Sequence, residues 1–285
     1  MTKFKEKFMH GVFLFCACVS ILAVLLICVF LFANGIPAMK EIGLFDFLMG
    51  RQWKPNNNIY GILPMILGSI YVTAGAILLG VPIGILVAVF MTRFCPKWLY
   101  KILKPAVDLL AGIPSVVYGF FGLMVIVPLI RDLFGGSGTS MLAASIVLGI
   151  MILPTIISVS ESAIRTVPES YYEGSLALGA TKERSIFMVM LPAAKSGILA
   201  AVVLGIGRAI GETMAVIMVA GNQARMPVGL LKGLRTMTAN IVTEMGYATG
   251  LHREALIATG VVLFVFILII NLSLSLLNRR SEHAN

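Results

Sequence analysis

An all-α membrane protein with six transmembrane helices is the fold class that this sequence predicts, and three observations lead to it. Of the 285 residues, 59% are hydrophobic and 12% are charged, whereas a soluble domain carries about 25% charged residues. The mean hydropathy of the chain is +0.97. The charges fall in short clusters between long apolar runs, and about 20 apolar residues form one membrane-crossing helix. These features exclude an ordinary soluble domain.

The first apolar run follows Lys3, Lys5 and Lys7. That start resembles a signal peptide, but the run is about twice the length of a typical signal-peptide core, so we expect an uncleaved first helix. The second run contains Pro82 and is expected to be tilted or kinked, which helices in a bundle tolerate. In chain order the six expected spans are Gly11–Ala33, Leu63–Met91, Leu109–Ile130, Met141–Ser160, Gly197–Gly221 and Ala255–Leu277.

The placement of lysine and arginine predicts the orientation of these spans. With the N-terminus inside, the inner segments hold thirteen Lys and Arg residues and the outer segments hold eight. Cytoplasmic segments carry an excess of these residues, so both termini are expected in the cytoplasm. The contrast is strongest in the compact inner segment from Arg93 to Lys104, which contains Cys95. Trp53 and His252 then face the outside, where His252 is expected to be a solvated loop residue without a metal role.

Charge and cysteine usage argue against two other functions. The chain has 22 Lys and Arg residues against 13 Asp and Glu residues, a formal net charge of +9, but no aromatic-rich basic patch that would favour nucleic-acid binding. Cys16, Cys18 and Cys28 lie in the first apolar run, where thiols behave as small hydrophobic groups. Since Cys16 and Cys18 are two residues apart, they face different sides of a helix. We therefore expect neither a nucleic-acid partner nor a metal or redox site.

Two outer segments are long enough to carry structure of their own. Residues 34–62 include an amphipathic stretch, Pro37–Met49, that is expected to lie in the membrane interface. Residues 222–254 include a short helical pattern, Thr236–Met245. Both segments would be available to a partner on the outer side.

The inner segment between the fourth and fifth spans predicts two short helices joined at a glycine. Pro168 suits the first position of a helix, and Glu169 then lies near the positive end of the helix dipole. Gly179 can end this helix in a left-handed conformation. Thr181 can cap a second helix that Pro192 limits. Taken alone, this elbow is typical of an amphipathic linker.

The spacing within the elbow suggests a more specific role. ABC importer permeases carry a cytoplasmic motif of Glu-Ala-Ala, three residues, Gly, nine residues, Ile, one residue and Leu-Pro, and this chain matches every spacing. Two small residues replace the two alanines, and Val replaces Ile. The resemblance implies that the elbow, residues 166–192, docks in a cleft of an ATPase subunit and transmits its closure. The matching residues are Glu173, Gly174, Ser175, Gly179, Val189, Leu191 and Pro192.

The fifth span contains an arginine near its middle, Arg208, with Glu212 one helical turn away. A central arginine costs about 2.5–3.5 kcal/mol on insertion scales, so it indicates function. The planar guanidinium suits bidentate contact with phosphate-like oxygens, and Glu212 would orient it. Two alternatives remain open at this point. One is an ion pair that only fixes helix packing, and the other is acid–base catalysis by the pair.

Three stretches resemble the PstC family, the permeases of phosphate-specific ABC transporters. Gly207–Val216 reads GRAIGETMAV, Ala111–Gly119 reads AGIPSVVYG, and Leu234–Ile241 reads LRTMTANI with Glu244 following it. Met214 after Gly-Glu-Thr favours PstC over its partner permease PstA. The resemblance runs from about Tyr60 to the end of the chain.

This resemblance implies a type I ABC importer permease fold in residues 63–280, after an N-terminal transmembrane helix and outer interfacial segment in residues 1–62. It implies a bacterial inner-membrane complex with a second, PstA-like permease, two PstB-like ATP-binding subunits and a PstS-like phosphate-binding protein. ATP and Mg²⁺ would bind the ATPase partner, because this chain has no Walker motif. Arg208, Glu212, Thr213 and Ser115 would line the phosphate pathway. Alternatives are a permease for sulfate or molybdate, or a membrane component that senses phosphate.

Overall fold

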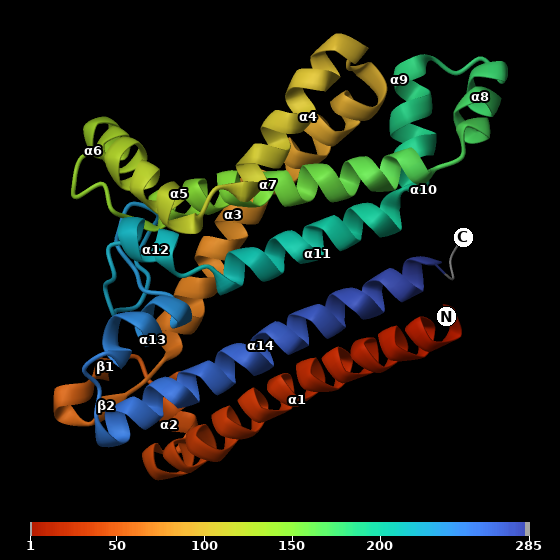
Figure 1. Cartoon of the computed structure of the whole chain (residues 1–285). Coiled ribbons are helices and arrows are strands. Elements are labelled where there is room, and N and C mark those ends of the chain that lie inside the picture. The colour runs from red at the N-terminus through yellow and green to blue at the C-terminus, as the bar shows by residue number, and fades with distance from the viewer. Residues whose placement is uncertain (1, 283–285) are drawn as a thin grey trace.

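A computed structural model describes residues 2–282 of the chain, with side chains for residues 5–273. Helices form nearly all of this part, and its one sheet is a two-stranded hairpin. Five helices are long and apolar enough to cross a membrane, and a bent pair of helices adds a sixth span when it is counted as one. This agrees with the all-α fold predicted from the apolar runs. Figure 1 shows the first and the last of the described residues at the same end of the molecule.

The N-terminal helix and the C-terminal helix pack against each other. Helix α1 (Thr2–Ile42) and helix α14 (Gly250–Glu282) run side by side (Figure 1). Gly35 allows the close approach, because a Cβ there would lie 2.6 Å from a methyl group of Val261. The expected interfacial stretch Pro37–Met49 is divided: α1 continues through Pro37 to Ile42, and a positive φ of 94° at Gly43 separates it from helix α2 (Leu44–Met49).

A small hairpin follows α2, at the end of the bundle that we call outer, after the predicted orientation; the opposite end, with the elbow, is called inner. Strand β1 (Trp53–Lys54) and strand β2 (Ile59–Tyr60) pair antiparallel around a 3₁₀ turn, Pro55–Asn57, with Trp53 opposite Tyr60. Both aromatic side chains are buried. The hairpin therefore anchors the N-terminal segment to the outer end of the bundle.

Two long helices make the centre of the bundle. Helix α3 (Leu63–Val89) continues through a π-helical turn (Phe90–Phe94), and helix α7 (Met141–Thr166) packs along it. Glycines allow this contact, since a Cβ at Gly80 would lie 2.8 Å from the side chain of Ile152 and one at Gly84 would lie 2.7 Å from that of Ile156. Small residues that bring helices close together are typical of packing inside membranes.

The third span is shorter than the predicted Leu109–Ile130. Helix α4 (Lys97–Gly112) ends before Pro114, and the span consists of helix α5 (Ser115–Phe121), a π turn (Gly122–Ile126) and helix α6 (Val127–Phe134). A proline disfavours the helical conformation of the residue before it, and Ile113 is accordingly extended, with φ −69° and ψ 126°. The break separates the charged inner helix α4 from the apolar span.

The elbow and the fifth span also differ from the prediction in two places. Helix α8 (Glu169–Ala177) and helix α9 (Lys182–Ser185) form the two expected short helices. Pro192 does not end the second one, because a wider π turn (Ile186–Met190) leads into helix α10 (Leu191–Ala193) and the chain remains helical as far as Ala193. A bend of 70° at Ala194 then leads into helix α11 (Lys195–Gly211).

The predicted span Gly197–Gly221 is not one continuous helix. Helix α11 ends at Gly211, and after two non-helical residues the short helix α12 (Met214–Val219) begins. The outer segment that follows contains helix α13 (Met237–Met245), which confirms the pattern predicted for Thr236–Met245. Thr236 caps α13, since its hydroxyl accepts the N–H of Ala239 at 3.2 Å.

Candidate functional site

Arg208 lies in the last turn of α11, half-buried, and points at the central helix α7. Its Nη1 donates a hydrogen bond of 3.3 Å to Oγ1 of Thr155. Among the side chains that the structure describes, no ion pair joins Arg208 to Glu212. The expectation that Glu212 orients the guanidinium is therefore wrong for this conformation. A neutral hydroxyl holds the cation instead.

Glu212 has a different role because the helix is broken there. Its backbone is extended, with φ −69° and ψ 133°, so it does not share a helical face with Arg208. Its Oε1 accepts the N–H of Ala215 at 3.0 Å, and its carbonyl oxygen accepts the hydroxyl of Thr238 at 3.0 Å. The side chain thus satisfies one of the free N–H groups at the start of α12.

Ser115 comes to the same level of the bundle through the packing of α5 on α12. A Cβ at Gly119 would lie 2.8 Å from Cα of Ala215, and one at Gly122 would lie 2.8 Å from the side chain of Val219. The two helices therefore run parallel. Ser115 begins α5 one turn before Gly119, which places it level with the break between α11 and α12.

The break in the fifth span thus lies level with the start of the third span. Ser115 follows the break before α5, and Glu212 and Thr213 form the break before α12, where the hydroxyl of Thr213 donates to the carbonyl of Gly211 at 3.2 Å. Interrupted helices expose backbone N–H and C=O groups at membrane depth, and such groups are tolerated where they line a cavity or contact protein. Transporters bind substrates at discontinuous helices of this kind.

The elbow has the conformation that its glycine predicts. Gly179 has a φ of 86°, and the hydroxyl of Thr181 accepts the N–H of Arg184 at 3.3 Å, which caps α9. Ser175 donates its hydroxyl to the carbonyl of Tyr172 at 2.8 Å. Of the other motif residues, Glu173, Gly174 and Pro192 are exposed and Leu191 is half-buried.

The elbow carries several exposed apolar side chains, which we call together the elbow patch. Leu178 is 91% exposed and Met188 is 71% exposed, which is unusual for apolar side chains on a folded surface. Patches of this kind mark contact surfaces, so this one favours a partner on the elbow. The exposed apolar residues of the elbow are Tyr171, Leu176, Leu178, Phe187 and Met188.

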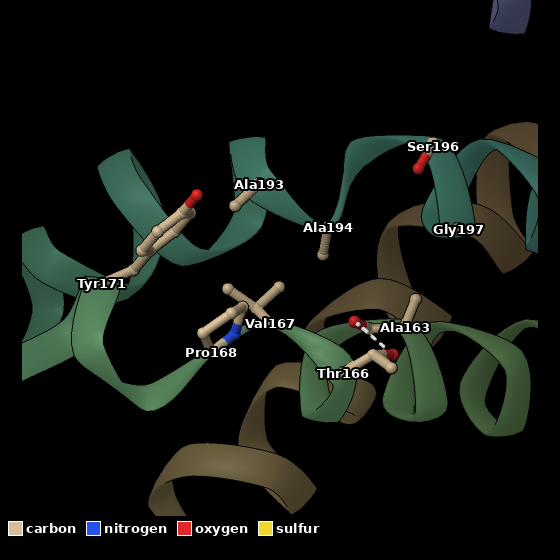
Figure 2. Close-up of a pocket in the computed structure, with 9 residues that line it drawn as sticks. All are labelled: Ala163, Thr166, Val167, Pro168, Tyr171, Ala193, Ala194, Ser196 and Gly197. Atoms are coloured by element: carbon tan, nitrogen blue, oxygen red, sulfur yellow. Dashed lines mark hydrogen bonds between the residues drawn. The ribbon is translucent and has the colours of Figure 1, made fainter. Parts of the chain in front are cut away.

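A cavity of about 310 Å³ lies at the base of the elbow, where α7 leads into α8 and α10 leads into α11. Figure 2 shows Val167, Pro168 and Tyr171 on one side and Ala193 and Ala194 on the other. Small side chains leave this space unfilled. Its lining residues are Ala163, Thr166, Val167, Pro168, Tyr171, Ala193, Ala194, Ser196 and Gly197.

The sequence did not predict the cluster around Glu244 on the outer side. The carboxylate accepts Nε1–H of Trp53 at 2.8 Å, lies 2.8 Å from Nε2 of His252, and pairs with Arg235. Burial is the largest single influence and raises the pKa of Glu244, but the three hydrogen bonds together hold this pKa below its usual value. His252 is consequently not the solvated loop residue that we expected.

A second buried carboxylate fixes the inner end of α7. Glu161 accepts Oη–H of Tyr100 at 2.6 Å and Nε–H of Arg165 at 3.1 Å, and Nζ of Lys104 lies 3.3 Å away. Tyr100 and Lys104 belong to α4, so the cluster ties α4 to α7. No local sequence signal identified the tie to α4, because Tyr100 and Lys104 lie 57 to 61 residues before Glu161 along the chain.

Comparison with known proteins gives one family and several relatives. The family described as "Binding-protein-dependent transport system inner membrane component" matches residues 80–283. A probable ABC transporter permease protein, YqgH of Bacillus subtilis, is 43% identical over 266 residues, which are 90% of this chain and 86% of that protein. The phosphate transport system permease protein PstC of Mesorhizobium japonicum is 37% identical over 84% of this chain and 80% of its own length.

A solved structure supports the fold. A chain in the crystal structure of a bacterial alginate ABC transporter, in complex with an alginate pentasaccharide-bound periplasmic protein, aligns with a TM-score of 0.67 and 18% identity. The alignment covers 96% of both chains. At this identity the likeness concerns the fold alone.

Proposed function

Since this chain belongs to the binding-protein-dependent inner-membrane permease family, we propose that it is the permease subunit of an ABC importer that translocates inorganic phosphate. Several relatives that are 33–37% identical are phosphate transport system permease proteins. In this family of transporters the ATPase activity belongs to a separate subunit, so the present chain supplies the path through the membrane.

The observation that carries the proposal is the unneutralised cation at the helix breaks. Arg208 is bonded to the neutral hydroxyl of Thr155, and in the described residues no carboxylate lies within ion-pair distance of it. A cation in this position stabilises an anion strongly, because the surroundings have a low dielectric constant. The guanidinium fork matches two oxygens of a tetrahedral oxyanion. Ser115 and Thr213 add hydroxyl groups at the same level.

The resemblance to phosphate permeases implies the remaining parts of the importer. The exposed apolar face of α5 would be covered by a second, PstA-like permease. The elbow patch would dock on one of two PstB-like ATP-binding subunits, which would hold ATP and Mg²⁺. A PstS-like phosphate-binding protein would dock on the outer segments, with both termini of this chain in the cytoplasm. The exposed residues on α5 are Val116, Val117, Phe120 and Phe121.

Uptake by the complete complex tests the proposal. The chain is reconstituted in proteoliposomes with its partner permease, two ATP-binding subunits and the binding protein, with ATP inside the vesicles. We expect ATP-dependent accumulation of labelled phosphate that excess unlabelled phosphate suppresses and excess sulfate or molybdate does not. Competition by sulfate or molybdate as strong as that by phosphate would assign the permease to another oxyanion.

A further inference from the structure

Helix α3 contacts the coupling elbow at its inner end through a charged pair. Nη1 of Arg93 lies 2.9 Å from both carboxylate oxygens of Glu169, the first residue of α8. The guanidinium carbon lies 5.4 Å from the centre of the Tyr172 ring, within range of a cation–π contact. The Arg93 side chain is 15% exposed and the Glu169 side chain is 56% exposed, so water partly screens this pair.

The second elbow helix contacts the same end of α3. Nζ of Lys182 in α9 lies 5.2 Å from the centre of the Phe94 ring. Below these contacts an apolar cluster joins the inner end of α3 to the elbow. Its buried members are Ala88, Val89, Ile164, Val167, Ile186, Met190, Ala194 and Ile198.

Besides its contact with α3, the elbow has two covalent connections to the rest of the bundle. The elbow joins α7 at the extended residues Val167 and Pro168, and it joins α11 at the 70° bend at Ala194. The cavity of about 310 Å³ shown in Figure 2 separates these two connections. Displacement of the elbow would therefore act on α7 and α11 through these connections, and on α3 through the Arg93 pair and the apolar cluster.

The outer end of α3 contacts the start of α13, and α13 in turn contacts the helix break at Glu212. Oγ of Ser69 accepts the N–H of Met237 at 3.0 Å, where α13 begins. Gly68 lies so close to the carbonyl oxygen of Arg235 that a Cβ would lie 2.3 Å from it. Thr238 of α13 in turn donates to the carbonyl of Glu212 at the helix break.

We propose that α3 transmits the movement of the elbow to the outer loop, and that Arg93 is the positioning residue that couples α8 to α3. The inference rests on the proposed function, because it takes the elbow as the contact with the ATPase. The span Leu63–Phe94 is 32 residues long, about 48 Å at 1.5 Å per residue, and it is held at both ends. Coupling between the elbow and the outer loop needs an element whose position both of them affect, and α3 contacts both.

The test measures the accessibility of the outer helix α13 to a thiol reagent, and its result does not depend on which anion is transported. In a background without the native cysteines, Val242→Cys places a thiol on the exposed side of α13, since Val242 is 51% exposed. The complete complex is labelled from outside with a membrane-impermeant thiol reagent, before and after trapping with ATP and vanadate. We expect trapping to change the labelling rate in the otherwise unaltered complex.

In Arg93→Gln and in Glu169→Gln the change in labelling rate on trapping should shrink by roughly 2- to 30-fold, while the ATP-binding subunits still co-purify. The exchanged pair, Arg93→Glu with Glu169→Arg, should recover part of the change. Arg131→Gln, which removes an exposed arginine at the other side of the bundle, is the matched control and should behave as the unaltered complex.

If trapping changes the labelling rate in Glu169→Gln as much as in the unaltered complex, the proposal is overturned. Because Glu169 is 56% exposed, this variant is expected to assemble even if Arg93→Gln does not. An exchanged pair as defective as the single variants would also overturn it. Phosphate uptake is measured on the same preparations. If the unaltered complex shows trapping-dependent labelling without phosphate uptake, the substrate assignment fails and the coupling result still stands.

Discussion

The hydroxyl of Thr238 donates a hydrogen bond of 3.0 Å to the carbonyl oxygen of Glu212, and this bond joins the outer helix α13 to the break in the fifth span. A carbonyl at a helix break has lost its partner within the helix, and leaving it unpaired in a buried place costs about 1–3 kcal/mol. The outer loop therefore satisfies the broken backbone, which explains why an outer segment reaches into the bundle.

Removal of this hydroxyl should weaken transport without preventing assembly. Thr238→Val keeps the size of the side chain and leaves the Glu212 carbonyl unpaired, so we expect a loss of about 1–3 kcal/mol in stability and reduced phosphate uptake. Thr243→Val is the control, because the hydroxyl of Thr243 bonds only to carbonyls within α13. Thermal unfolding and uptake are measured for both variants. Equal behaviour of the two would show that the contact with Glu212 has no special role.

Some parts of this structure could be predicted from the sequence because their signals are local. Thr181 caps a helix at the expected position, the helical pattern of Thr236–Met245 forms α13, and Gly179 has the expected positive φ. The break after Gly211 could not be predicted, because no proline marks it and it depends on the packing of α12 against α5. The environment of His252 depends on Trp53, which lies far away in the sequence, so its burial was also missed.

The positive φ of Gly179 predicts that the two elbow glycines respond differently to alanine. Gly179→Ala places a Cβ in the left-handed region, which costs about 1–2 kcal/mol, and we expect the elbow to shift and ATP hydrolysis stimulated by the loaded binding protein to fall. Gly174→Ala is the control, since this residue lies inside α8 with nothing within 4 Å of an added Cβ. Stimulation of ATP hydrolysis is measured in the assembled complex. Equal stimulation in both variants would contradict a requirement for the left-handed turn.

The depressed pKa of Glu244 predicts an acid-sensitive outer region. Because hydrogen bonds from Trp53, His252 and Arg235 hold this pKa below the ordinary 4.5, the carboxylate stabilises the fold above pH 4.5, and the stabilisation is lost as the pH falls through the folded-state pKa. The unfolding midpoint is measured between neutral pH and about pH 3. Glu244→Gln should be less stable near neutrality and should depend less on pH.

Glu254→Gln removes an exposed carboxylate from α14 and is the control for this measurement. Its pH dependence should match that of the unaltered chain. If Glu244→Gln also matches the unaltered chain, then the hydrogen-bonded carboxylate does not contribute to the pH dependence of stability.

Cys95 tests the predicted orientation of the spans. The structure places it half-buried between the inner end of α3 and α4, and the charge pattern puts this end in the cytoplasm. In a variant that keeps Cys95 as its only cysteine, an impermeant thiol reagent should label inverted vesicles and spare intact cells. A cysteine introduced at the exposed outer residue Thr249 should give the reverse pattern. Labelling of Cys95 in intact cells would invert the topology.

Arg208 and Glu212 can be separated by substitution, because their roles differ in the structure. In Glu212→Gln the amide oxygen can still accept the N–H of Ala215, so we expect uptake close to normal. Arg208→Gln removes the cation that would meet the anion, and uptake should fall by roughly 10- to 150-fold, which corresponds to one hydrogen bond to a charged group. Arg208→Lys keeps the charge without the planar fork, and it should retain partial activity.

The double variant, Arg208→Gln with Glu212→Gln, decides between binding and scaffolding. If the two residues formed a structural ion pair, removal of one would strand a buried charge at a cost of about 3–5 kcal/mol, and removal of both would relieve it. Since Arg208 bonds to Thr155 and Glu212 caps α12, we expect the double variant to assemble and remain as inactive as Arg208→Gln. Complex yield and phosphate uptake are measured for all four variants. The double variant has no cation at position 208. Recovery of uptake in it would therefore show that transport does not need this cation, and would assign Arg208 to packing.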